Sequence, residues 1–215
     1  MKKILLLLVV AFSLQQVKAQ SFQKGSVVTT INYGIDIYSV YQTYSAYNIP
    51  NSSSSKTSAA GSRNWNFEAE YGLLKWLGVG IHLKLDNYFT SKDTSTGYTP
   101  TAIGFEGGVL INAHLIRANH FDLVIGCNLG FSTLTYTADA FNDQIYGDGS
   151  WTDLHISPRF YFGRFGINLN FYDPVINYKS LTSNNSNWGL GETVLASWLG
   201  KGGGATIGIQ YRFIN

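Results

Sequence analysis

Eight stretches of this sequence alternate apolar and polar residues with a period of two. Residues 78–89, which read GVGIHLKLDNYF, place valine, isoleucine and leucine at alternate positions, with glycine, histidine, lysine and aspartate between them. Successive side chains of a β-strand point to opposite faces, so this period predicts strands with one apolar and one polar face. The stretches are 26–38, 64–72, 78–89, 101–115, 121–135, 151–162, 165–172 and 204–213. Elsewhere only residues 190–199 suggest a short helical turn, so the pattern predicts a single all-β domain.

The connections between the stretches alternate between long and short. The long ones are 39–63, 90–100, 136–150 and 173–203, and the short ones are 73–76, 116–120 and 163–164. This alternation predicts an antiparallel up-and-down meander of eight strands, with the long loops at one end and the short turns at the other. Transmembrane barrels have this asymmetry, with short periplasmic turns and longer extracellular loops.

The polar faces of these stretches are unlike the surface of a soluble protein. They are rich in glycine, asparagine and serine, and only 13% of the chain is charged, about half of what is usual in globular proteins. Small residues relieve crowding inside an eight-stranded barrel, whose interior is just wide enough for side chains to fill. The apolar faces carry no charge, and a Lys or Arg facing the middle of a bilayer costs about 2–4 kcal/mol. We therefore expect the apolar faces to contact lipid and the polar faces to line the interior.

The polar faces carry charges of both signs together with three histidines. Buried charges must be paired or hydrogen-bonded, so these side chains are expected to form a polar network that fills the interior. Its predicted members are Glu68, Glu70, His82, Lys84, Asp86, Glu106, His114, Asp122, Asp153, His155, Arg159 and Arg212. On this assignment, Leu83→Lys should impair membrane insertion more than Lys84→Leu does.

Aromatic residues gather near both ends of the predicted strands, as is typical of the two interfaces of a membrane. Those at the short-turn end are Tyr71, Trp76, Phe121, Phe160, Phe162, Phe165, Tyr211 and Phe213. Those at the long-loop end are Tyr38, Trp65, Tyr88, Phe89, Phe131, Trp151 and Phe171. Both groups are expected to face outward as aromatic girdles.

The N-terminus reads MKKILLLLVVAFSLQQVKA, with two lysines, an apolar run and then small residues. This order is typical of a secretory signal peptide. We expect residues 1–19 to be cleaved and residues 20–215 to form an exported barrel domain. The apolar run is shorter than the roughly 20 residues that a transmembrane helix needs. The single cysteine, Cys127, excludes an internal disulfide framework, and the net charge of +2 does not favour nucleic-acid binding.

The N-terminal segment, the eight alternating stretches and the closing GIQYRF (208–213) resemble the small outer-membrane β-barrels of Gram-negative bacteria, of the porin-like OmpA/OmpX type. The resemblance implies an eight-stranded antiparallel transmembrane β-barrel in the cell outer membrane, in contact with lipid and lipopolysaccharide. It also implies recognition of the C-terminal strand by the barrel assembly machinery. The family usually ends on an aromatic residue, whereas here Phe213 is followed by Ile214 and Asn215.

The function expected of such a barrel is structural or surface-binding, including adhesion, with a plugged polar interior. A large pore is not expected, because aqueous channels occur at about 16–18 strands. Tyr38, Tyr41, Tyr44 and Tyr47 lie in the first long connection, and tyrosines are common in binding surfaces. An extracellular partner would meet the protein at these long loops.

Two alternatives remain open at this point. A secreted soluble barrel, such as a lipocalin, would turn the apolar faces inward around a ligand. An outer-membrane lipid A hydrolase would use His155 and Ser157, whose spacing resembles the His-x-Ser of lipid A deacylases, with Asp153 to orient the histidine. The glutamate that completes the deacylase triad is absent from residues 165–171. We therefore expect no enzyme activity.

No cofactor or metal site is expected. His82 and His114 share a polar face, but a metal would need further ligands at the same depth. The oxygens of Asp139, Asp143 and Asp148 do not match the spacing of an EF-hand loop.

Overall fold

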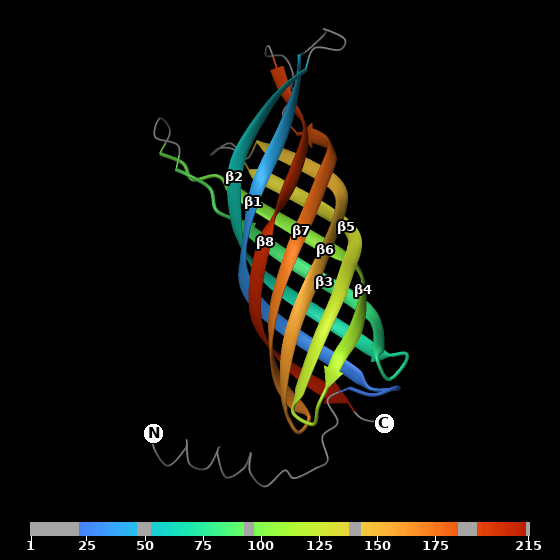
Figure 1. Ribbon diagram of the computed structural model, residues 1–215. Coiled ribbons are helices and arrows are strands. Elements are labelled where there is room, and N and C mark those ends of the chain that lie inside the picture. Colours follow the sequence, from blue (N-terminus) through green and yellow to red (C-terminus); the bar gives the residue numbers. More distant parts are fainter. Residues whose placement is uncertain (1–21, 47–52, 93–96, 138–142, 185–192, 214–215) are drawn as a thin grey trace, which may run out of the picture.

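A computed structural model shows a closed barrel of eight antiparallel strands (Figure 1). It describes residues 22–46, 53–92, 97–137, 143–184 and 193–213. The strands are β1 (Val27–Ala46), β2 (Ser53–Gly72), β3 (Leu77–Tyr88), β4 (Thr101–Arg117), β5 (Phe121–Thr137), β6 (Gln144–Phe162), β7 (Phe165–Ser183) and β8 (Thr193–Phe213). Each strand pairs with the next along the chain, and β1 closes the ring by pairing with β8 from Val27↔Phe213 to Ala46↔Thr193. This confirms the predicted meander, its strand count and its closure.

The short connections lie at one end of the barrel, together with the beginning of β1 and the end of β8 (Figure 1). The predicted signal peptide, residues 1–19, lies outside the described residues. Among the residues that the structure describes, no helix is long and apolar enough to cross a membrane.

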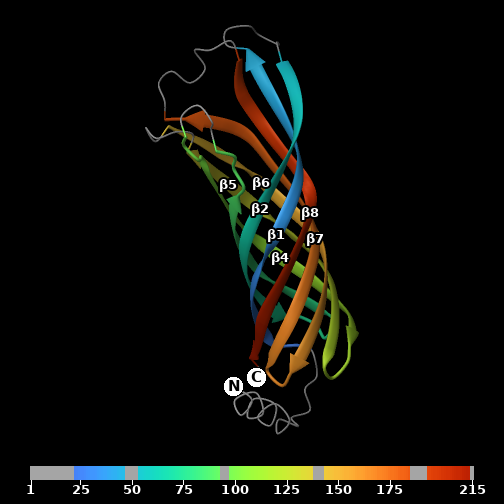
Figure 2. The same ribbon diagram turned by 90° about the vertical axis from the view of Figure 1, so that its left-hand side faces the viewer.

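Most of the segments predicted as long loops are strand. β1 and β2 remain paired as far as Ser45↔Ser53, and β7 and β8 occupy much of 173–203, where a loop and a helical turn were predicted. Figure 2 shows β1, β2 and β8 rising above the rest of the barrel. The apolar alternation fades in these extensions because neither face contacts lipid. Backbone pairing continues through them, and it leaves no mark in the side-chain pattern.

Outward side chains are apolar over about half of each long strand. On β3 the side chains of Ile81, Leu83 and Leu85 are exposed on the outer surface, whereas those of His82, Lys84 and Asp86 are buried. Further toward the long-loop end the outward residues become polar, as at Arg63 of β2, Asn87 of β3 and Asp173 of β7. The outward apolar residues below this boundary form a continuous surface, here called the apolar band. Its extent fits the roughly 9–11 tilted residues that cross a bilayer.

The apolar band predicts a depth-dependent cost for an introduced charge. Leu83→Lys should lower the free energy of unfolding in vesicles by about 2–4 kcal/mol, because its ammonium would face the hydrocarbon. Asn87→Lys is the matched control, since it puts the same group outward on the same strand but beyond the band. Urea unfolding of the two variants, followed by tryptophan fluorescence, measures the difference. Equal losses at both positions would contradict the assigned membrane boundary.

Candidate functional site

The candidate site is the filled interior of the barrel together with its mouth at the long-loop end. The interior contains all twelve side chains of the predicted network, each at most 7% exposed. Asp36, which sequence reasoning placed on the polar face but left out of the network, is fully buried among them. The strands position these groups by alternation, since every second side chain points inward.

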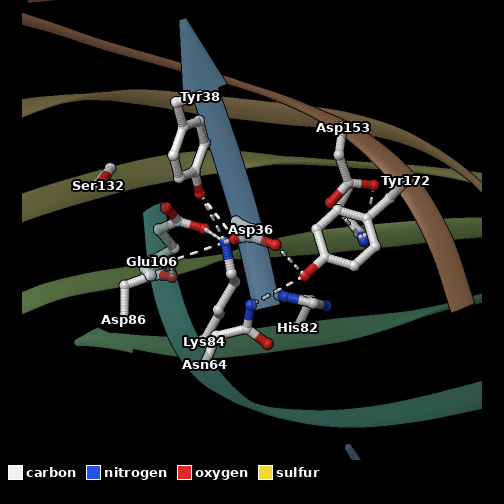
Figure 3. A network of polar contacts seen from close by, with 12 residues as sticks. Asp36, Tyr38, Asn64, His82, Lys84, Asp86, Glu106, Ser132, Asp153 and Tyr172 are labelled. Atoms are coloured by element: carbon white, nitrogen blue, oxygen red, sulfur yellow. Dashed lines mark hydrogen bonds and ion pairs between the residues drawn. The ribbon is translucent and has the colours of Figure 1, made fainter. Parts of the chain in front are cut away.

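Lys84 is the centre of the upper part of this network (Figure 3). Its Nζ lies 2.7 Å from Asp36 Oδ2, 3.0 Å from Asp86 Oδ2 and 3.1 Å from Glu106 Oε2. These partners come from β1, β3 and β4, so one ammonium joins three carboxylates from three strands. All four side chains are at most 1% exposed. The Lys84 cluster, as we call these four residues, is therefore shielded from bulk water.

Two tyrosines complete the surroundings of the Lys84 cluster. Tyr38 Oη donates to Asp36 Oδ2 at 2.7 Å, and Tyr172 Oη donates to Asp36 Oδ1 at 2.5 Å. Tyr172 comes from β7, which β8, β1 and β2 separate from β3, the strand that carries Lys84. A Cβ at Gly204 would collide with the Tyr172 ring and with Asp36. Glycine at this position therefore makes room for the contact across the lumen.

The middle of the interior contains two histidine–carboxylate pairs. His82 Nδ1 lies 3.3 Å from Glu68 Oε1, and His155 Nδ1 lies 3.1 Å from Asp153 Oδ1. His155 Nε2 is also 2.9 Å from the side-chain oxygen of Asn112. Both ring nitrogens of His155 thus have partners from inside the barrel.

Ser157 does not contact the histidine that precedes it on β6. Its Oγ donates to the backbone oxygen of Leu169 at 3.0 Å. A hydrolytic serine needs a base within hydrogen-bond reach of its hydroxyl. The hydrogen bond of Ser157 instead connects β6 to β7.

The lower part of the interior is built on Glu70. Its carboxylate lies 2.7 Å from Arg159 Nη1 and 2.7 Å from His114 Nε2. His114 Nδ1 in turn lies 2.7 Å from Asp122 Oδ2, so the imidazole bridges two carboxylates. The ring of Phe22 stacks on His114 with 3.4 Å between ring centroids, and this covers the network from the short-turn end.

Arg212 lies inside the barrel at the same end. Its Nη2 donates to the backbone oxygen of Gly163 at 3.2 Å. Its guanidinium carbon lies 5.1 Å from the centroid of the Tyr161 ring. A cation over an aromatic face is attracted by the ring quadrupole.

Above the Lys84 cluster the interior is filled by aromatic side chains, here called the aromatic plug. It comprises Tyr38, Tyr88, Trp151, Tyr178 and Trp198, with Val40, Ala102 and Ile176 packed among them. The prediction that Tyr38, Tyr88 and Trp151 belong to an outward girdle is therefore wrong. The parity of the strands could have revealed this.

Parity places each of these three residues inside the barrel. Trp151 shares its side of β6 with Asp153, Tyr88 shares its side of β3 with Asp86, and Tyr38 shares its side of β1 with Asp36. Proximity to a strand end suggests a girdle position, but the alternation of the strand decides which way a side chain points. Of the other girdle residues, Phe121 and Tyr211 are half-buried, and the rest, including Trp65, Phe89 and Phe131, are exposed on the outside.

The mouth lies beyond the plug. There a half-open cavity of about 290 Å³ is lined by residues that include Ala60, Tyr88, Phe89, Ala102, Leu134 and Trp198. β3 ends at Tyr88, whereas β2 continues outward to Ser53, so the wall of the barrel is lower on this side. The cavity is lined mainly by apolar side chains, and it lies on the side where the wall is lower.

The described residues contain no group of three or more His, Cys, Asp or Glu that could hold a metal ion. Asp139, one of the three loop aspartates considered above, lies outside the described residues. Cys127 points outward from β5 and is half-buried, away from the interior network.

No protein-family model and no curated protein matches this chain. The solved structure of the outer membrane protein OprG from Pseudomonas aeruginosa superimposes with a TM-score of 0.58 at 11% identity, over 93% of this chain and 100% of OprG. The chain has the fold of small outer-membrane β-barrels. The outer membrane protein AlkL matches with a TM-score of 0.58 at 13% identity, over 93% of this chain and 95% of AlkL. Neisserial surface protein A matches with a TM-score of 0.51 at 8% identity, over 88% of this chain and 98% of that protein.

Proposed function

We propose that this protein is an integral outer-membrane barrel with a structural and surface-binding role and a lumen closed to bulk solute. The observation that carries the proposal is strand length. β1, β2 and β8 have 20, 20 and 21 residues, about twice the 9–11 that a spanning strand needs. The excess forms an ordered wall on the far side of the apolar band, and an ordered wall offers a partner a fixed surface.

The filled interior supports the closed lumen. From the aromatic plug through the Lys84 cluster to Phe22, buried side chains occupy the barrel at each level. Eight strands enclose only enough space for such filling. The role is therefore one of anchoring and display, without bulk transport.

The extended wall and the mouth support the binding role. Tyr41 and Lys56 are exposed on the paired extensions of β1 and β2, and the apolar cavity lies beside them within the mouth. Tyr47 and the side chain of Tyr44 lie outside the described residues. In this proposal a cleaved signal peptide exports the chain, and the assembly machinery recognises β8. Lipid and lipopolysaccharide then surround the apolar band.

The two rival functions have less support. A soluble ligand-binding barrel needs apolar side chains inside, whereas this barrel carries Ile81, Leu83 and Leu85 outside and Lys84 inside. A hydrolase needs Ser157 next to a base, and Ser157 instead donates to a backbone carbonyl. We propose that the protein is not an enzyme.

Shortening the β1–β2 hairpin tests the surface-binding role. Replacing residues 43–55 by Asn-Gly joins the paired residues Gln42 and Lys56 through a two-residue hairpin turn. Cells of a non-adherent Gram-negative strain that display the whole protein should bind cultured epithelial cells several-fold better than cells that display the shortened variant. The barrel itself should survive, because the deletion lies beyond the apolar band.

Heat-modifiable gel migration reports barrel closure in both proteins. An epitope tag at Gly97 measures how much of each protein intact cells display, so that adherence is compared at equal amounts. The proposed binding role would be contradicted if the two strains adhered equally, or if the whole protein gave no more adherence than the strain shows without it.

A further inference from the structure

The short-turn end of the barrel is positively charged over its described surface. Its exposed basic residues are Lys24, Lys75, Arg117 and Arg164. The two carboxylates at this end of the described chain, Glu70 and Asp122, are buried in the interior and paired there. This surface therefore offers cations to an anionic partner and no competing carboxylate.

The turn between β2 and β3 is also apolar. Leu73, Leu74 and Trp76 are 46%, 40% and 52% exposed, and Leu115 of the neighbouring β4 is 58% exposed. Large apolar side chains at the tip of a tight turn would be unfavourable in water. Tryptophan is favoured at membrane interfaces, where its ring contacts apolar chains and its N–H meets polar groups. The turn therefore has the composition of a segment that lies in the interface of the bilayer.

A hydrogen bond holds two of the cations beside this apolar turn. Arg117 Nη1 donates to the backbone oxygen of Lys75 at 2.9 Å, and the backbone N–H of His114 donates to the oxygen of Trp76 at 2.8 Å. These contacts bring the end of β4 against the β2–β3 turn, at the lower end in Figure 1. Neither Lys75 nor Arg117 forms an ion pair with a carboxylate of the described chain.

We propose that Lys75 and Arg117 bind the phosphate of an anionic phospholipid, with Leu73, Leu74 and Trp76 along its acyl chains. Guanidinium groups match phosphate oxygens in geometry and charge, and anionic bilayer surfaces attract basic residues at the interface. A cell-wall polymer or an acidic protein would neutralise the cations but would leave the leucines and Trp76 in water. The inference rests on the proposed membrane location, and it adds a lipid site at the short-turn end.

Tryptophan quenching in mixed vesicles tests this site. The full chain is refolded into vesicles of phosphatidylcholine and phosphatidylglycerol, in which one lipid or the other carries brominated acyl chains. Trp76 is adjacent to Lys75, so quenching of its fluorescence reports the lipid bound there. The Trp76→Phe variant gives the background quenching of the other tryptophans. We expect phosphatidylglycerol to be preferred, with the preference falling about fivefold for each cation removed. K75Q/R117Q should bind the two lipids alike, whereas Lys75→Arg should keep the preference.

Lys201→Gln is the matched control, because Lys201 is an exposed cation of β8 beyond the opposite end of the apolar band. It should leave the preference unchanged. An undiminished preference in K75Q/R117Q would overturn the proposal. A combined result would also overturn it, in which the two lipids quench the unaltered protein equally and the protein sediments with isolated peptidoglycan only when Lys75 and Arg117 are present. Failure to form a heat-modifiable barrel in either lipid would instead contradict the proposed function.

Discussion

Lys84→Met is expected to lower the free energy of unfolding by about 3–5 kcal/mol, because it removes one partner of a buried ion cluster. Asp36, Asp86 and Glu106 would then face one another without the ammonium that now lies within 3.1 Å of each. Urea unfolding of the refolded barrel measures this loss.

Lys201→Met is the control for Lys84→Met, since it removes a lysine that is exposed on β8. Exposed charges contribute about 0–1 kcal/mol, so this variant should remain close to the unaltered protein. A similarly small loss in Lys84→Met would contradict the cluster. The expectation that Leu83→Lys impairs membrane insertion more than Lys84→Leu does concerns a different measurement, and it stays a prediction.

Trp151→Ala is expected to lower the free energy of unfolding by about 3–5 kcal/mol, as for a large buried aromatic residue. Trp151 is fully buried in the aromatic plug, and its ring stacks on His82 with 4.8 Å between centroids. Removing the indole leaves a cavity between the plug and the polar network, which rigid strands cannot close. Trp65→Ala is the control, because Trp65 faces outward and its loss creates no internal cavity.

Planar-bilayer recordings give a second measure of the plug. The unaltered protein should show no stable large-conductance steps. Such steps from pure, folded protein would contradict the closed lumen, and an equal loss of stability in Trp151→Ala and Trp65→Ala would contradict the inward position of Trp151.

The two faces of each strand could be predicted from sequence residue by residue. Parity alone assigns Leu83 and Lys84 to opposite faces, and Figure 3 shows Lys84 inside the barrel. The assignment works because a pleated strand turns alternate side chains in opposite directions, and lipid favours apolar side chains on the face that contacts it. Parity also identifies Trp151 as interior, although its position near a strand end suggested a girdle.

The ends of the strands could not be predicted in the same way. β1 and β2 continue to Ala46 and from Ser53 through serine-rich sequence that resembles a loop. Beyond the apolar band both faces tolerate polar residues, so the period that marks a strand disappears while the backbone pairing persists. The mouth and its cavity depend on these extensions, and they became visible only in the folded barrel.

The sequence by itself determined the strand count, the inward set of side chains and the end that carries the short turns, because each is a local property of pleat or turn. Only the tertiary structure decided which interior groups meet. Lys84 on β3 reaches Asp36 on β1, and Tyr172 on β7 reaches the same carboxylate across the lumen. Such contacts depend on the radius of the barrel and the stagger of its strands. These are properties of the closed ring, which no single strand encodes.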